Sequence, residues 1–305
     1  MTRQLVLPLC SCSLAFLLGC AQTGARQDAN DPGRGTAFTN QRPVYTCHKV
    51  SGVITIDGQL TERCWRGRPT FPVRGLADGG KPPHTSVFKM AWDDEYLYFG
   101  GVLEDADVWS RFGLRDIDYT REEAKRISSF RPPRRMAPES LDDWQFLESD
   151  IHKKDKFVKL FLDPDSDGLK YVEFHINPLN NIFDAWYERG FALTSDGAVE
   201  RRNRGSHVPW TCEGLVTATH VEGTLNAPHD TDKGWSFEMA IPWKALAPFC
   251  QGSLPPRPGD VWGCHLGRKD RDRFGQPSNI YWTWPVIGLI QCHLPSTWGK
   301  LLFGQ

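Results

Sequence analysis

Apolar and polar residues alternate along most of the chain from residue 86 onward, in short runs bounded by Gly, Pro, Asp and Asn. Alternation with a period of two is typical of β-strands, and long amphipathic helical patterns between the runs are absent. The pattern therefore predicts an all-β fold, an antiparallel β-sandwich of the jelly-roll or immunoglobulin-like kind, with one face of each strand buried and the other free for function. The predicted strands are SVFKMAW (86–92), EYLYFGGVL (95–103), KFVKLFLD (156–163), LKYVEFHI (169–176), NIFDAWY (181–187), GLVTATHV (214–221), GWSFEMAI (234–241), VWGCHLG (261–267) and KLLF (300–303).

One long polar segment, residues 110–153, interrupts this rhythm. Its sequence TREEAKRISSFRPPRRMAPESLDDWQFL predicts a short helix, a Pro-rich basic turn and a second helical segment. A connection of this length inside a compact domain is usually functional or mobile. We therefore expect a partly helical insertion in the sandwich.

An acidic segment separates two of the predicted strands. Asp163, Asp165 and Asp167 alternate and are followed by Gly168, which is how a calcium-binding loop begins. The residue at position 12 of such a loop is Phe174, which cannot bind a metal, and both flanks have the strand pattern. The segment is therefore predicted to be a β-hairpin turn. A structural calcium ion on the three carboxylates is the alternative, because like charges this close repel one another.

The bulk composition excludes few functions. The chain has 305 residues and a formal net charge of −1, so no overall field attracts it to nucleic acid, and the RPPRR patch (131–135) is better explained as a solvated loop. Twelve tryptophans are many for this length. Most of them should be core anchors, but Trp is also a platform for flat ligand faces.

The N-terminus has the features of an export signal. Arg3 precedes an apolar run, Leu5–Leu18, that is too short for a stable membrane span and ends in LLGC. LLGC resembles the lipobox of bacterial lipoproteins, which implies a signal peptide over residues 1–19 and a lipid on the Cys20 thiol. Residues 20–43 are polar and Gly-rich, so they should form a flexible tether to a domain over 44–305.

The expected destination follows from the residue after the lipidated cysteine. Ala21 is not Asp, which is the inner-membrane retention signal of enteric bacteria, so an exported lipoprotein of the outer membrane is favoured. Six cysteines remain in the mature domain, and an even number permits three disulfides, with buried free thiols as the alternative. The six are Cys47, Cys64, Cys212, Cys250, Cys264 and Cys292.

Six segments resemble, in chain order, the motifs of family 9 carbohydrate-binding modules. The resemblance implies an antiparallel β-sandwich that binds poly- or oligosaccharide without catalysis, sometimes holds calcium, and accompanies polysaccharide-degrading enzymes. It covers about residues 50–305. The segments are ITIDGQLTERCW (54–65), FKMAWDDEYLYFGGVLEDADVW (88–109), KLFLDPDSDGLKYVEFHINPLNNIFDAWY (159–187), GTLNAPHDTDKGWSFEMAIPWKAL (223–246), PGDVWGCHLGRKDRD (258–272) and HLPSTWGKLLF (293–303).

The sugar-binding positions depart from the family pattern. Family members clamp a sugar between two Trp side chains; the first position falls at residues 153–154, both Lys, and the second at Cys292. A family acid on the following strand falls at Lys159. A sugar-contacting Arg and Asn fall at His175 and Asn177, so that only the Asn is kept.

A substitute clamp could come from other tryptophans. Trp144 in the insertion would face Trp282 or Trp298, and Arg268, Asp270 and His293 would supply hydrogen bonds at the rim. The alternatives are that Trp298 fills the core, that Trp144 packs within its own helical segment, and that the rim residues form surface ion pairs.

Three further functions stay open at this point. A glycosidase needs paired carboxylates, for which Glu173 and Asp184 are candidates, although no motif singles them out. A haem carrier could use Met90, Met136 or Met239 but lacks CxxCH. A structural surface lipoprotein whose sugar site has decayed would explain the missing clamp.

Overall fold

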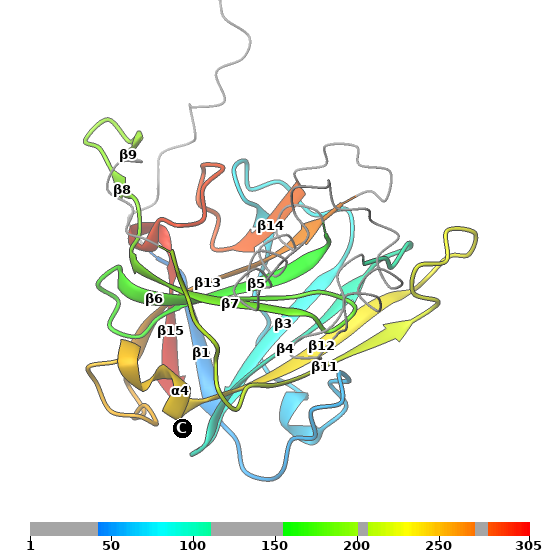
Figure 1. The fold of residues 1–305 in the computed structure, drawn as a ribbon, viewed down its shortest axis with the longest axis horizontal. Helices are drawn as coiled ribbons and strands as arrows, with labels where there is room; N and C mark the ends of the chain where they lie inside the picture. The colour runs from blue at the N-terminus through cyan, green and yellow to red at the C-terminus, as the bar shows by residue number, and fades with distance from the viewer. Residues whose placement is uncertain (1–41, 111–154, 201–206, 272–279) are drawn as a thin grey trace, which may run out of the picture. The chain divides into compact units, whose positions relative to one another are not determined.

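The computed structural model describes residues 42–110, 155–200, 207–271 and 280–305 (Figure 1). The predicted signal peptide, Cys20, the tether up to residue 41 and the insertion beyond Ser110, with Trp144, lie outside the described residues. Among the described residues, no helix has the length and apolar character needed to cross a membrane.

Strands dominate the described residues, and the helical elements among them are single turns. The strands are β1 (Val44–Lys49), β2 (Arg74–Gly75), β3 (Ser86–Trp92), β4 (Tyr96–Glu104), β5 (Phe157–Asp163), β6 (Leu169–Ile176), β7 (Ile182–Arg189), β8 (Ala192–Leu193), β9 (Val199–Glu200), β10 (His207–Pro209), β11 (Val216–Glu222), β12 (Gly234–Pro242), β13 (Val261–Asp270), β14 (Ile280–Trp284) and β15 (Gly299–Gly304). The helical turns are η1 (Arg63–Trp65), α4 (Trp243–Leu246), η3 (Ala247–Phe249) and η4 (Pro295–Thr297).

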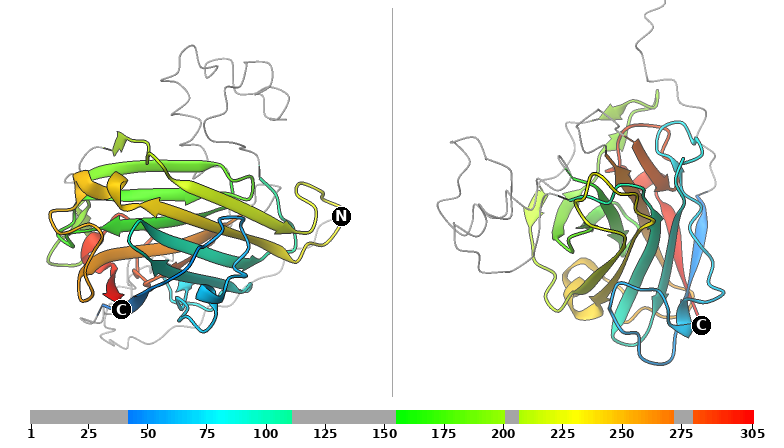
Figure 2. Two further views of the ribbon diagram at one scale, coloured as in Figure 1. Left: turned by 90° about the horizontal axis from the view of Figure 1, so that it is seen from below. Right: turned by 90° about the vertical axis from the view of Figure 1, so that its right-hand side faces the viewer.

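The main sheet curls into two layers (Figure 2). Its strand order is β10-β7-β6-β5-β13-β15-β1-β3-β4-β12-β11, and β14 pairs with β13 beside this path. The pairs are antiparallel, as the sequence predicts, except that β1 runs parallel to both β15 and β3. We call the β7-β6-β5-β13 half the first layer and the β3-β4-β12 half the second layer.

The apolar core lies between the two layers. Phe88, Phe99 and Phe237 from the second layer meet Leu160 and Phe174 from the first, and all five are fully buried. The rings of Phe99 and Phe237 are 5.0 Å apart at an edge-to-face angle, a favourable arrangement for buried aromatic side chains.

The nine predicted strands are confirmed as β3, β4, β5, β6, β7, β11, β12, β13 and β15. The predicted hairpin turn is confirmed too, because β5 and β6 pair antiparallel on either side of Asp163–Leu169. The sequence pattern missed β1 and β14, whose residues VYTCHK and IYWTW do not alternate clearly.

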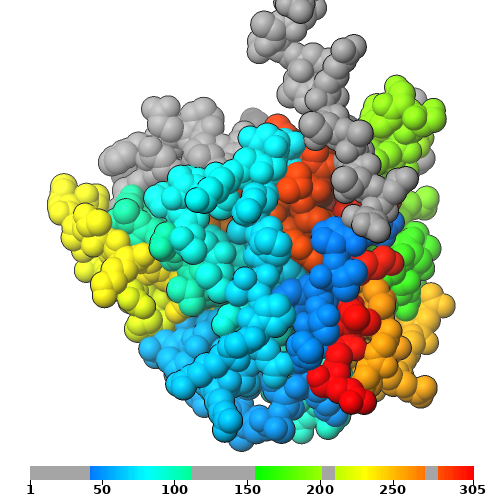
Figure 3. All heavy atoms as spheres, turned by 180° about the vertical axis from the view of Figure 1, so that it is seen from behind, coloured from blue at the N-terminus to red at the C-terminus, as the bar shows by residue number. Residues whose placement is uncertain are grey.

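The expectation that each strand has one free face is wrong for the central strands. β5 is buried at all seven positions and β12 at eight of its nine. These strands are buried on both faces because segments that connect other strands pack against the outside of the sandwich. Residues 285–298 cover the outer face of the first layer, and residues 50–66 cover the outer face of the second. Figure 3, seen from behind, shows blue β1 beside red β15, with the lighter blue and cyan chain that follows β1 spread over much of the rest of this face.

The outer face of the second layer is organised around Glu238, and we call it the Glu238 face. Glu238 is 0% exposed and accepts hydrogen bonds from Trp65 Nε1 at 2.9 Å and from the backbone N–H groups of Asp57 and Gly58 at 3.1 Å each. Gly58 has φ +85°, and a Cβ there would lie 2.5 Å from the carbonyl carbon of Thr219, so only glycine fits. The ITIDGQLTERCW motif is therefore a cover segment fastened by one carboxylate.

Candidate functional site

The outer face of the first layer holds a second buried cluster, which we call the Glu173 face. It is built by alternate residues of β5, β6, β7 and β13, and the segment 285–298 packs on it. Because these positions alternate with the core positions, their side chains point away from the core. The cluster contains Leu76, Phe157, Phe161, Tyr171, Phe183, Ala185, Tyr187, Ile287, Leu294 and Trp298.

Glu173 is the carboxylate of this face. Its Oε1 lies 2.7 Å from His175 Nε2, and its Oε2 accepts a hydrogen bond of 2.6 Å from the Tyr187 hydroxyl. Burial would raise the pKa of Glu173, but His175 beside it and the hydrogen bonds from His175 and Tyr187 hold that pKa well below its usual range. Glu173 is therefore ionised, and His175 stacks on Phe157 with ring centroids 4.4 Å apart.

Two lysines flank the half-buried Tyr281 ring on the same face. Lys159 Nζ lies 4.5 Å and Lys269 Nζ 4.6 Å from the ring centroid, both within cation–π range. Burial, with the charges of Arg271 and Lys159, lowers the pKa of Lys269 to about 8. Both amines are hydrogen-bond donors close to a partly accessible aromatic residue.

The loop after β14 completes the rim of the face. Cys292 and His293 are partly exposed. Lys159 Nζ lies 2.5 Å from Cys292 Sγ, and the Tyr171 hydroxyl lies 2.9 Å from His293 Nδ1. Lys159 and Cys292, which the sequence resemblance aligns with a family acid and the second family Trp, are thus in contact with each other.

His265 lies beneath this rim with both ring nitrogens buried and without a hydrogen-bond partner. Its ring is 5.7 Å from Phe161 and 6.2 Å from Trp298, measured between centroids. Burial, reinforced by Lys159 and His293, lowers the pKa of His265 well below its usual value. The ring is therefore neutral and acts as an aromatic filler.

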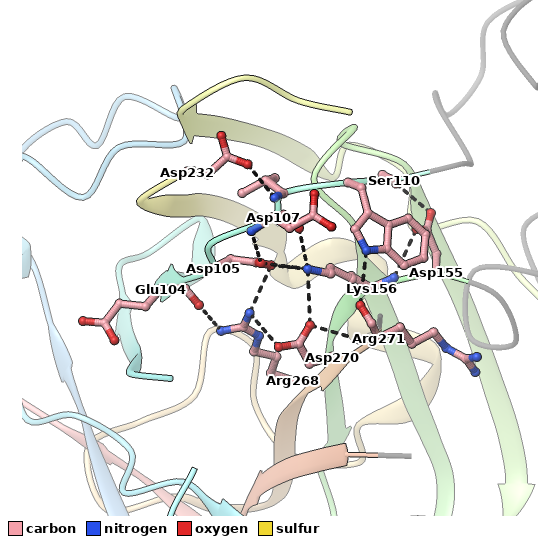
Figure 4. Close-up of polar contacts among 12 residues, drawn as sticks. Glu104, Asp105, Asp107, Ser110, Asp155, Lys156, Asp232, Arg268, Asp270 and Arg271 are labelled. Atoms are coloured by element: carbon pink, nitrogen blue, oxygen red, sulfur yellow. Dashed lines mark hydrogen bonds and ion pairs between the residues drawn. The ribbon is translucent and has the colours of Figure 1, made fainter. Parts of the chain in front are cut away.

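A second polar cluster lies beside Ser110 and Asp155, the described residues on either side of the insertion (Figure 4). Lys156 Nζ is 2.7 Å from Asp105 Oδ1 and 3.4 Å from Asp270 Oδ1. Arg268 Nη2 is 3.1 Å from Asp105 Oδ2 and 3.2 Å from Asp270 Oδ2. Two cations and two carboxylates are thus paired, and burial of such charges is tolerated only with this kind of compensation.

The two ends of the insertion meet at this cluster. Ser110 Oγ donates a hydrogen bond of 2.6 Å to Asp155 Oδ2, and Asn177 Nδ2 donates to the same oxygen at 3.0 Å. Trp109 Nε1 donates to the Arg271 carbonyl at 3.2 Å. The insertion therefore starts and ends at one fixed point beside β6 and β13.

The structure does not place Trp298 and Trp282 as the sequence-based clamp hypothesis expects, because both side chains are buried. Trp298 is 0% exposed and packs against Phe161 and Tyr171, with Nε1 donating to the Cys292 carbonyl at 2.7 Å. Trp282 is 3% exposed and lies under the Arg268 guanidinium. Both fill space between packed elements, so neither presents a ring face to a sugar among the described residues.

The other expected site residues fall in two groups. Arg268, Asp270 and Asn177 belong to the cluster at the base of the insertion, where Arg268 is 1% exposed and pairs with Asp270 instead of reaching solvent. His175 and His293 belong to the Glu173 face. The structure therefore does not gather them into a single pocket, and Trp144 lies outside the described residues.

Of the three aspartates in the acidic turn, only Asp163 has a buried carboxylate oxygen without a hydrogen-bond partner among the described residues. Asp163 Oδ1 is buried without a partner, and burial, with the charges of Asp167 and Asp165, raises the pKa of Asp163 to about 6. Asp165 accepts from the Gln251 N–H and Asp167 from the Leu169 N–H. Within the described ranges, no three His, Cys, Asp or Glu side chains are grouped to hold a metal ion. Calcium here stays a prediction.

The six cysteines of the described residues are free thiols, which is the second of the two alternatives left open by the sequence. Cys47, Cys212 and Cys264 are buried, whereas Cys64, Cys250 and Cys292 are partly exposed.

Sequence reasoning missed four charged residues that organise this structure. Lys159 and Glu173, as a partner of His175, lie on the Glu173 face, Glu238 lies on the Glu238 face, and Lys156 lies in the cluster at the base of the insertion. One signal was available. Each is a charge within a mainly apolar strand run, such as KFVKLFLD or GWSFEMAI. The alternating pattern predicts that such a charge faces solvent, because the pattern alone does not reveal that another segment covers that face.

Comparison with known proteins gives structural matches only. No family model matches the chain, and no curated protein matches it. A carbohydrate-binding protein from Bacteroides uniformis, provisionally so described, has a TM-score of 0.51 and 16% identity over 86% of this chain and 100% of that one. The chain shares its fold with this protein. The all-β sandwich expected from the sequence is therefore confirmed.

Two further matches are sugar complexes of a family 9 carbohydrate-binding module. A family 9 carbohydrate-binding module from Caldicellulosiruptor kristjanssonii matches in complex with cellotriose, with a TM-score of 0.44, 14% identity, and coverage of 86% of this chain and 94% of that one. In complex with glucose it matches with a TM-score of 0.43, 14% identity, and coverage of 85% and 96%.

Proposed function

We propose that the protein is a non-catalytic carbohydrate-binding module that holds poly- or oligosaccharide near degrading enzymes. The observation that supports it is the order of six family 9-like segments on a sandwich that shares its fold with a provisionally carbohydrate-binding protein. Fold likeness alone does not assign a ligand, so the proposal depends on the residues of one face.

The candidate sugar site is the rim of the Glu173 face. Tyr281, Cys292 and His293 are its partly exposed residues, and the Lys159 and Lys269 amines lie at its base. Sugar sites combine an aromatic or apolar surface with a few fixed polar groups that bind hydroxyls. Tyr281 supplies the first, and Lys269 and His293 supply donors. A role for Trp144 stays a prediction from the sequence.

The carboxylates expected for a glycosidase lie on opposite faces of the first layer. Asp184 pairs with Phe174, a core residue, and accepts a hydrogen bond from the Cys212 N–H at 2.8 Å. Glu173 is the residue before Phe174 and so points the other way. These two carboxylates cannot flank one glycosidic bond, which favours binding without catalysis.

We further propose that Cys20 carries a lipid and holds the module at the outer membrane. The lipobox-like LLGC segment supports this. Processing should be sensitive to globomycin, and Cys20→Ala should release the protein from membranes. Retention of Cys20→Ala in the membrane fraction would contradict the anchor.

A glycan array probed with the purified protein, with and without calcium, tests sugar binding. Tyr281→Ala should weaken binding. Tyr96 is a half-buried tyrosine at the Glu238 face, and Tyr96→Ala should leave binding unchanged. If the wild-type protein retains no glycan under either condition, the module is a structural lipoprotein with a closed sugar site. A gain of binding with calcium would support the ion predicted at Asp163.

A further inference from the structure

Lys159 and Cys292 make an unusual side-chain contact across 133 residues of sequence. Lys159 lies in the middle of β5 and is 4% exposed, and Cys292 lies in the segment that covers the Glu173 face. The Nζ–Sγ separation is 2.5 Å. This is shorter than an ordinary hydrogen bond from nitrogen to sulfur. It is the span of a single oxygen atom bonded to both.

The surroundings hold the two groups together. Burial would lower the pKa of Lys159, but Cys292, Tyr281 and Glu173 raise it above its usual value. Peroxides oxidise a cysteine sulfur to a sulfenic acid, and the Lys159 amine is the group in contact with that sulfur. The thiol is also partly accessible, so a small oxidant can reach it.

Two other cysteines of the chain provide a comparison. Cys64 and Cys250 are partly exposed, like Cys292. Burial raises the pKa of both thiols, which keeps them protonated. All three cysteines are partly exposed, and Cys292 differs from the other two by its contact with Lys159, so faster oxidation of Cys292 is the result expected from that contact.

We propose that Lys159 and Cys292 form a redox-sensitive pair, in which oxidation joins Nζ to Sγ through one bridging oxygen. The inference rests on this contact and does not depend on sugar binding. It assigns a modification site to two positions at which the sequence departs from the family 9 pattern.

The chemistry balances with hydrogen peroxide as the oxidant. One peroxide converts the Cys292 thiol to a sulfenic acid and releases water. A second peroxide then oxidises the sulfenic acid and the neutral Lys159 amine together to an N–O–S link and two waters, after the ammonium has given its proton to solvent. Two equivalents of a dithiol reverse the change, restoring amine and thiol and releasing water.

The link would fasten the covering segment to the sheet. Lys159 belongs to β5 and Cys292 to residues 285–298, so a covalent bond closes a loop of more than a hundred residues. Closing a loop restricts the unfolded chain, as a disulfide does. Oxidised protein should therefore unfold at a higher temperature than reduced protein.

Peptide mapping of the wild-type protein after peroxide treatment tests the proposal. We expect the Lys159 and Cys292 peptides to be joined, with the mass of one oxygen gained and two hydrogens lost. Trypsin should no longer cleave after Lys159, and dithiothreitol should restore both peptides. Cys64 and Cys250 should stay unmodified at the same peroxide dose.

Other outcomes would overturn it. A joined peptide with no added oxygen excludes the bridge, and separate peptides with Cys292 as sulfinic or sulfonic acid exclude the pair. Equal oxidation of Cys64, Cys250 and Cys292 excludes activation by Lys159. Cys292→Ser should abolish the shift in unfolding temperature. A shift that persists in Cys292→Ser contradicts the proposal, and the wild-type map decides even if a variant misfolds.

Discussion

The Glu238 face and the Glu173 face each bury one glutamate on the outside of the sandwich, but the two carboxylates have different partners. Among the described residues, Glu238 accepts from neutral donors, namely the Trp65 indole and two backbone N–H groups of the covering loop. Glu173 accepts hydrogen bonds from Tyr187 and His175, and its charge is among the causes that raise the pKa of the nearby Lys159. Their pKa values consequently move in opposite directions, up for Glu238 and down for Glu173.

The difference teaches what each face is for. On the Glu238 face, the carboxylate binds the backbone of the covering loop. This fixes the loop in place and closes the surface. On the Glu173 face, the polar groups come from strands and a loop far apart in sequence, and a partly exposed rim remains. Charged groups gathered beside an accessible rim are a feature of functional sites, whereas backbone-fastening carboxylates serve the fold.

Removing the Glu238 carboxylate should have the largest effect on stability. Glu238→Ala leaves two buried donors and one partly buried donor without an acceptor, and we expect the free energy of unfolding to fall by about 3 kcal/mol. Urea denaturation followed by tryptophan fluorescence measures it. Glycan binding by the folded fraction should be unchanged. Loss of binding without loss of stability would reverse the roles of the two faces.

The two glutamates should give opposite pH dependences. Burial raises the pKa of Glu238 from 4.5 to about 7, so the folded state holds its proton more tightly and stability falls as pH rises through that window. The lowered pKa of Glu173 contributes stability that is present above the usual glutamate range and lost as pH falls below it.

Thermal unfolding across pH separates these contributions. Glu238→Gln should flatten the decline between pH 4.5 and about 7, and Glu173→Gln should flatten only the acid limb. If both variants flatten the same limb, the contrast between neutral and charged partners does not hold.

A smaller change is expected from Tyr281 at the rim. Tyr281→Ala removes a half-buried aromatic ring, and we expect affinity for a bound glycan to fall about tenfold, corresponding to roughly 1.4 kcal/mol. Isothermal titration calorimetry measures the affinity, and Tyr96→Ala is the matched control on the other face. Equal losses of glycan affinity in the two variants would show that the sugar site is not on the Glu173 face.

Much of the fold could be predicted from the sequence, because strand alternation is local. The acidic turn between β5 and β6 followed from its flanks alone. The site could not be predicted in the same way. Lys159 and Cys292 are in contact because the 285–298 segment packs on the face formed by β5 and β13. The alternating pattern of a strand does not show whether another segment buries a charged residue in it. For Trp298 the sequence favours the core but leaves a clamp open, and its packing places it in the core.

The most direct test of the central claim, that the rim of the Glu173 face binds sugar, is protection of cysteines from alkylation. Cys292 lies at this rim, and Cys64 packs at the Glu238 face with similar partial exposure. Maleimide labelling rates of both should be measured by mass spectrometry with and without the glycan found by the array. The account predicts that bound glycan slows labelling of Cys292 and leaves Cys64 unchanged. An unchanged rate at Cys292, or protection of Cys64 instead, would contradict it.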